Sequence, residues 1–122
     1  MHTPEQLRDF ILQALDDIQA EDIKTLKVTD ISSFTDYMII ATGRSDRHVK
    51  AAADNVLEHL LEKGIKPIGK EGFESGEWVL LDFDDAIVHV MRQQTREFYD
   101  LEELWGEEVQ KLVNRHRDGA VE

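Results

Sequence analysis

Two aspartates beside a predicted hairpin, Asp82 and Asp84, are the strongest candidates for catalytic chemistry in this chain. Paired carboxylates can hold divalent metal ions, and a turn such as Gly43-Arg44-Ser45 before a helix can hold a triphosphate. This combination is typical of metal-dependent nucleotidyltransferases. In those enzymes the acid pair follows the turn by about one helix, whereas here two further predicted elements intervene. A divergent nucleotidyltransferase using Asp82 and Asp84 is therefore kept only as the alternative function.

The other reactive residue types favour catalysis still less. The chain has five histidines and no cysteine, which excludes disulfides, thiolate nucleophiles and cysteine-bound metals. No two histidines have the i, i+4 spacing of a helical metal site, and no serine lies in a Gly-x-Ser-x-Gly elbow. We therefore predict no catalytic residue, no metal site and no cofactor. His89 is expected to be a hydrogen-bonded, partly buried imidazole.

Length and charge limit the class of partner. The 122 residues carry 14 Lys and Arg against 26 Asp and Glu, a formal net charge of −12, and 41% are hydrophobic. These values predict one folded domain. Nucleic-acid affinity depends on cations that neutralise phosphates, so the acidity favours a basic protein partner, or simply solubility. Without a signal peptide or an apolar run of about 20 residues, a cytoplasmic protein with no membrane segment is expected.

Two helices are indicated by the spacing of apolar residues. Thr3 as N-cap and Pro4 at the first helical position begin a helix predicted over about residues 4–20. A second helix is predicted between the turn at Gly43 and Gly64, where the glycine ends it. Because this helix lies between two predicted strands, it is interpreted as the crossover of a parallel pair.

The remaining apolar segments predict strands. A short strand alternates over about residues 26–31, and a buried central strand covers residues 36–43. Residues 77–83 and 86–92 flank a two-residue turn and form a hairpin. The predicted fold is a single α/β domain with a mixed sheet of about five strands flanked by helices.

The hairpin register separates two faces of the sheet. One face carries apolar residues alone and should lie under the helices. The other face pairs Trp78 with Met91, Leu80 with His89, and Asp82 with Ile87. Large apolar groups mixed with a carboxylate and an imidazole are unusual on a solvated sheet. This face is therefore either a docking patch or the contact with a second layer of the same protein.

Several segments, taken together, match the pattern of a known family. They are DYMIIATG at 36–43, Ser45 with RHV at 47–49, Gly72, WVLLD at 78–82, VHVM at 88–91, and Arg96 with YDLEELW at 99–105. In this order and spacing, over about residues 5–105, the chain closely resembles the ribosomal silencing factors (RsfS), or Iojap family. One departure is Asp84, where the family usually has glycine. This position is expected to need a positive φ, which Asp tolerates.

The resemblance implies a nucleotidyltransferase-like fold that lacks catalytic residues. It also implies binding to the large ribosomal subunit at its interface protein L-fourteen, which blocks small-subunit joining and represses translation under nutrient limitation. Homodimers are a further expectation, as is a domain over 1–105 with a helical extension and frayed tail over 106–122. The contact role falls on Trp78, Leu80, Asp82, His89 and Met91, with Tyr99, Leu104 and Trp105 as a second group. Leu101, Leu104 and Trp105 could instead pin the last helix to the sheet.

Overall fold

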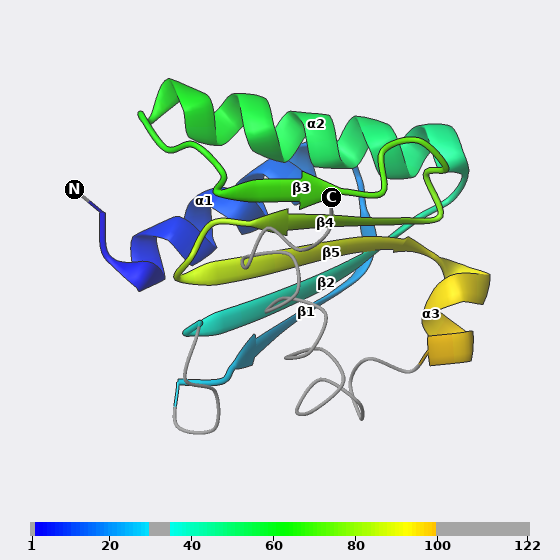
Figure 1. Ribbon diagram of the computed structural model, residues 1–122, viewed down its shortest axis with the longest axis horizontal. Coiled ribbons are helices and arrows are strands. Elements are labelled where there is room, and N and C mark those ends of the chain that lie inside the picture. Colours follow the sequence, from blue (N-terminus) through cyan, green and yellow to red (C-terminus); the bar gives the residue numbers. More distant parts are fainter. Residues whose placement is uncertain (1, 30–34, 100–122) are drawn as a thin grey trace.

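A computed structural model describes residues 2–29 and 35–99 of the chain (Figure 1). The elements are α1 (Pro4–Asp17), β1 (Glu21–Lys27), β2 (Tyr37–Gly43), α2 (Asp46–Glu62), β3 (Gly69–Glu71), β4 (Trp78–Asp82), β5 (Ala86–Arg92) and α3 (Gln93–Tyr99). The predicted α/β domain with a five-stranded mixed sheet is confirmed. Within the described ranges, no helix combines the length and apolar character needed to cross a membrane. The proposed extension over 106–122 lies outside these ranges.

The sheet has the strand order β1-β2-β5-β4-β3, with β5 at its centre. β2 and β5 run parallel, whereas the other three neighbouring pairs are antiparallel. It follows that β3 is parallel to β2 but separated from it by two strands. The predicted parallel crossover through α2 therefore exists, although it carries the chain to the sheet edge and not to a neighbouring strand.

Both long helices begin at the predicted caps. The Thr3 hydroxyl accepts the Gln6 N–H at 3.0 Å, and the Gln6 side chain accepts the Thr3 N–H at 2.9 Å, a complete capping box. α1 ends at Asp17, earlier than predicted, because Gln19 turns the chain with φ 59° toward β1. At α2 the Ser45 hydroxyl accepts the His48 N–H at 3.0 Å.

α1 and α2 cover one face of the sheet, which we call the helix face (Figure 1). In its three central strands the buried residues of this face include the apolar residues Ile39, Ala41, Val79, Leu81, Val88 and Val90. Gly43 allows α2 to approach closely, since a Cβ there would lie 2.6 Å from the Val49 Cγ2 atom. The predicted apolar face under the helices is thus confirmed.

The predicted hairpin register is also confirmed. Trp78 pairs with Met91, and Asp82 pairs with Ile87 at the turn. Asp84 has φ 74°, as expected for a position where glycine is usual, and the Asp85 N–H donates to the Phe83 carbonyl at 2.9 Å. This tight turn fixes which side chains of β4 and β5 share a face.

Candidate docking face

The sheet face opposite α1 and α2 is the candidate functional surface, and we call it the Trp78 face. Five buried apolar residues form its own cluster, against which Trp78 packs. By strand alternation, Thr42, Asp82 and His89 also lie on this face, and all three are buried. The apolar members are Met38, Ile40, Leu80, Ile87 and Met91.

Burial separates the five hairpin residues predicted to contact a partner. Leu80 is 3% exposed, and Asp82, His89 and Met91 are 0% exposed. Trp78 alone among these five is partly exposed. Trp78 is therefore the most accessible of the five side chains, and contact of all five with a partner stays a prediction.

Trp78 is held in place by His89. Its indole N–H donates to Nδ1 of His89 at 2.9 Å, and the ring centroids are 5.8 Å apart. Because the indole can only donate, Nδ1 is the acceptor and the neutral imidazole carries its proton on Nε2. Nε2 is buried without a partner among the described residues. Burial lowers the pKa of His89 to about 4, so the ring is neutral near pH 7 and keeps this hydrogen bond.

This environment refines the expectation for His89. The predicted hydrogen bond is confirmed at Nδ1, but the ring is fully buried and not partly buried. The sequence pattern places His89 on the correct face. It does not show that a neighbouring indole occupies one ring nitrogen while the other is left unpaired.

Asp82 serves the hairpin turn. Its buried carboxylate accepts the Asp84 backbone N–H at 2.9 Å, which supports the positive φ of Asp84. Within the described part of the chain, no group of three or more His, Asp or Glu side chains is placed to hold a metal ion. The hydrogen bond to Asp84 gives Asp82 a structural role at the turn.

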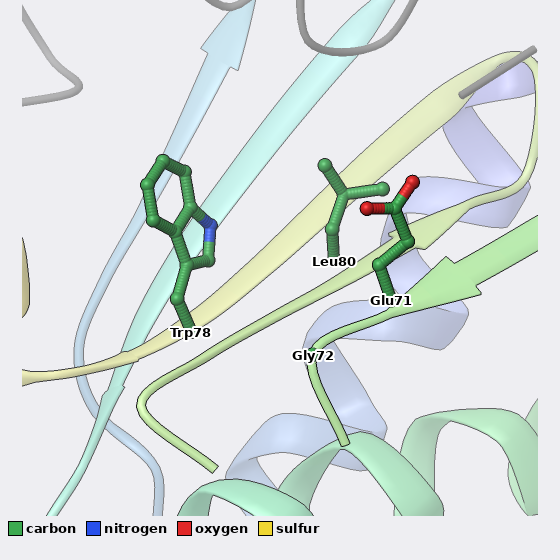
Figure 2. Close-up of a pocket in the computed structure, with 4 residues that line it drawn as sticks. All are labelled: Glu71, Gly72, Trp78 and Leu80. Atoms are coloured by element: carbon green, nitrogen blue, oxygen red, sulfur yellow. The ribbon is translucent and has the colours of Figure 1, made fainter. Parts of the chain in front are cut away.

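A pocket of about 180 Å³ opens beside Trp78 and is lined by Glu71, Gly72, Trp78 and Leu80. Glu71 is directly opposite Leu80 in the β3–β4 register, so both side chains lie on the Trp78 face. Figure 2 shows the Trp78 indole on one side of Leu80 and the Glu71 carboxylate on the other. The pocket therefore combines an aromatic wall, an apolar floor and an acidic wall.

Gly72 makes this arrangement possible. Its φ is 93°, and a Cβ at this position would lie 1.9 Å from the Trp78 carbonyl oxygen. Any side chain would therefore push the β3–β4 connection away from Trp78. Sequence reasoning missed Glu71 because a three-residue strand has no periodicity to detect. Its neighbour Gly72, already part of the family pattern, was the available signal.

The structure describes little of the second predicted contact group. Leu104, Trp105 and the side chain of Tyr99 lie outside the described part, so their role stays a prediction. The nearby α3 is anchored by Arg96, whose side chain is 5% exposed. It donates to the Thr42 hydroxyl at 2.8 Å and to the Asp22 carbonyl at 2.7 Å. These bonds tie α3 to the sheet at the end of β2.

Known proteins share this fold and sequence. The family model described as "Ribosomal silencing factor during starvation" matches residues 1–121. The ribosomal silencing factor RsfS of Chromobacterium violaceum is 45% identical over 102 residues, which is 84% of each protein. A Mus musculus protein named "Mitochondrial assembly of ribosomal large subunit protein 1" is 32% identical over 100 residues, 80% of this chain and 44% of that protein.

A solved structure agrees with the sequence relatives. The crystal structure of a Chromobacterium violaceum protein has a TM-score of 0.83 to this chain at 44% identity, covering 86% of this chain and 88% of that one. The two proteins therefore share one fold over most of their length. The chain belongs to the RsfS family of ribosomal silencing factors.

Proposed function

We propose that this protein binds the large ribosomal subunit through its interface protein L-fourteen and sterically blocks joining of the small subunit. Translation would then fall under nutrient limitation, in the cytoplasm, without turnover, metal or cofactor. Membership of the silencing-factor family supports this proposal, as does a mouse relative named for assembly of the ribosomal large subunit. The net charge of −12 suits a basic ribosomal protein, because opposite charge speeds association and selects the partner.

The observation that carries the proposal is the placement of Trp78. A tryptophan that is partly exposed and already held by a buried neighbour loses little freedom on binding. Tryptophan is also enriched among the few interface residues that supply most of the binding energy. The pocket beside it gives a protruding partner side chain a place to enter.

The direct test is sedimentation of purified large and small subunits through a sucrose gradient, with and without this protein. We expect the protein to travel with the large subunit and the joined-ribosome peak to fall as protein is added. An unchanged joined peak, with the protein left at the top of the gradient, would contradict the proposal. Adding the protein to preformed joined ribosomes separates blocked joining from active dissociation.

A homodimer is proposed as a second state of the same protein. If a second copy covers the Trp78 face, it competes with the ribosome, and self-association then limits the silencing activity. Sedimentation equilibrium on the wild type and on a Trp78→Ala variant tests this use of the face. Equal dimer affinity in both proteins would place the dimer contact elsewhere.

A further inference from the structure

We infer that the pocket beside Trp78 receives a lysine or arginine side chain from a basic protein partner. This inference rests on the proposed function and specifies the chemistry of its contact. It concerns the pocket lined by Glu71, Gly72, Trp78 and Leu80, of which Glu71 has no assigned role in the family pattern described above.

The pocket lining matches both parts of a long basic side chain. Leu80 and the indole of Trp78 offer apolar surface to the aliphatic stem. The face of an indole attracts a guanidinium or ammonium group, and the Glu71 carboxylate can form a charge-assisted hydrogen bond with the same group. Among the described residues that line the pocket, Glu71 carries a charge, and this charge is negative.

The fold sets the backbone positions around the pocket. The β3–β4 ladder places the backbone of Glu71 opposite Leu80, and the indole of Trp78 is held by His89. Gly72, with φ 93°, keeps the connection between them close to the Trp78 carbonyl. A held indole needs little ordering when the pocket is filled, so more of its contact energy appears as affinity.

The sign of the charge selects the class of macromolecule. A phosphate group next to Glu71 would be repelled locally by the carboxylate and at longer range by a chain of net charge −12. A basic side chain is attracted both by the carboxylate and by the negative net charge of the chain. We therefore assign this pocket to a protein surface of the large subunit and not to its RNA.

The test uses the full chain and compares Glu71→Gln with Glu58→Gln. Each variant removes one negative charge, but Glu58 is exposed on α2, which covers the helix face. Affinity for purified large subunits is measured over a range of salt concentrations, and melting temperatures verify folding. We expect Glu71→Gln to bind about tenfold more weakly with a shallower salt dependence, while Glu58→Gln stays near the wild type.

Two results would overturn the inference. Unchanged affinity in Glu71→Gln would mean that no cation meets this carboxylate. Tighter binding of Glu71→Gln, with Glu58→Gln unchanged, would mean that the pocket faces phosphate, because removing a negative charge then relieves repulsion. Either result leaves the proposed function standing, provided that the wild type binds the subunit.

A ribosome-free measurement separates the pocket from the proposed function. N-acetyl-arginine methylamide and its neutral citrulline analogue are titrated into ¹⁵N-labelled protein, and the Trp78 indole N–H signal is followed by NMR. The signal should shift saturably with the arginine probe at tens of millimolar, and Glu71→Gln should abolish the shift. Equal responses to the two probes would overturn the pocket assignment even if the subunit binds.

Discussion

The two faces of the sheet are both buried, yet they are built differently. On the helix face the buried strand residues are apolar apart from the hydroxyl of Tyr37, which bonds to Arg8 and Glu5 of α1. On the Trp78 face, Thr42, Asp82 and His89 are buried among apolar neighbours. Each of these polar groups bonds to a feature at the rim of the sheet: Thr42 accepts from Arg96 of α3, Asp82 from the hairpin turn, and His89 from Trp78.

This difference suggests separate roles for the two faces: one stabilises the fold, and the other fixes the positions of neighbouring elements. Buried polar groups stabilise a fold weakly in net terms, because the hydrogen bonds they gain offset the water they lose. They do fix direction, since a hydrogen bond is satisfied in few geometries. We therefore expect the helix face to supply most of the stability and the Trp78 face to set the positions of α3, the turn and the indole.

The largest contrast is expected between two adjacent residues, Leu81 on the helix face and Leu80 on the Trp78 face. Leu81→Ala should cost about 4 kcal/mol, because it leaves a cavity in a closed apolar core. Leu80→Ala should cost about 2 kcal/mol, since Leu80 borders a pocket that is already open on one side.

Urea unfolding of both variants measures these costs, and an unchanged denaturant slope verifies that only stability has altered. Leu80→Ala should in addition weaken large-subunit binding, because it removes the pocket floor. If the two substitutions cost the same, the proposed division between the faces is wrong.

The sequence alone predicts much of this architecture, because its signals are local. Thr3 and Ser45 mark their helices through bonds to residues three positions away, and the alternation around Asp84 fixes the hairpin register. The pairing of β2 with β5 and the position of β3 are set by contacts distant in sequence, which alternation does not encode. For the same reason the pattern identifies the Trp78 face but neither its burial nor the position of Glu71 beside Leu80.

The second prediction concerns the stability of the fold at low pH. Burial lowers the pKa of His89 from 6.5 to about 4, so the unfolded chain takes up a proton before the folded chain does. The associated stability is complete above about pH 6.5 and is lost as the pH falls toward 4. The loss amounts to about 3 kcal/mol. Urea unfolding at several pH values between 4 and 7 measures it.

His89→Gln is the matched control for this pH dependence, because the amide is neutral at every pH and its oxygen can still accept from Trp78. The variant should lose less stability than the wild type between pH 7 and pH 4, with the remaining loss due to carboxylates. Equal losses in the two proteins would show that His89 is not the group responsible.

The third prediction concerns binding at the rim of the Trp78 face. Trp78→Ala should weaken large-subunit binding by about 2 kcal/mol, or roughly 30-fold, if the indole is a central contact. Leu61→Ala is the control, because Leu61 is 57% exposed on α2. Sedimentation binding assays on folded variants measure both. A Trp78→Ala protein that folds and binds like the wild type would move the docking surface away from this face.

The smallest expected effect is at the hairpin turn between β4 and β5. Asp84 has φ 74°, a region that is costly for residues with a Cβ, so Asp84→Gly should raise stability by about 0.5 kcal/mol. The Asp82 carboxylate keeps its bond, because its donor is the backbone N–H of residue 84.

Asp85→Gly is the matched control for this turn, because Asp85 does not have a positive φ and gains nothing from glycine. It should lower stability by a similar amount through added freedom of the unfolded chain. Urea midpoints of the two variants should therefore move in opposite directions. If both fall, the side chain of Asp84 stabilises the turn by more than its backbone conformation costs. The Trp78 face would then depend on that carboxylate as well as on Asp82.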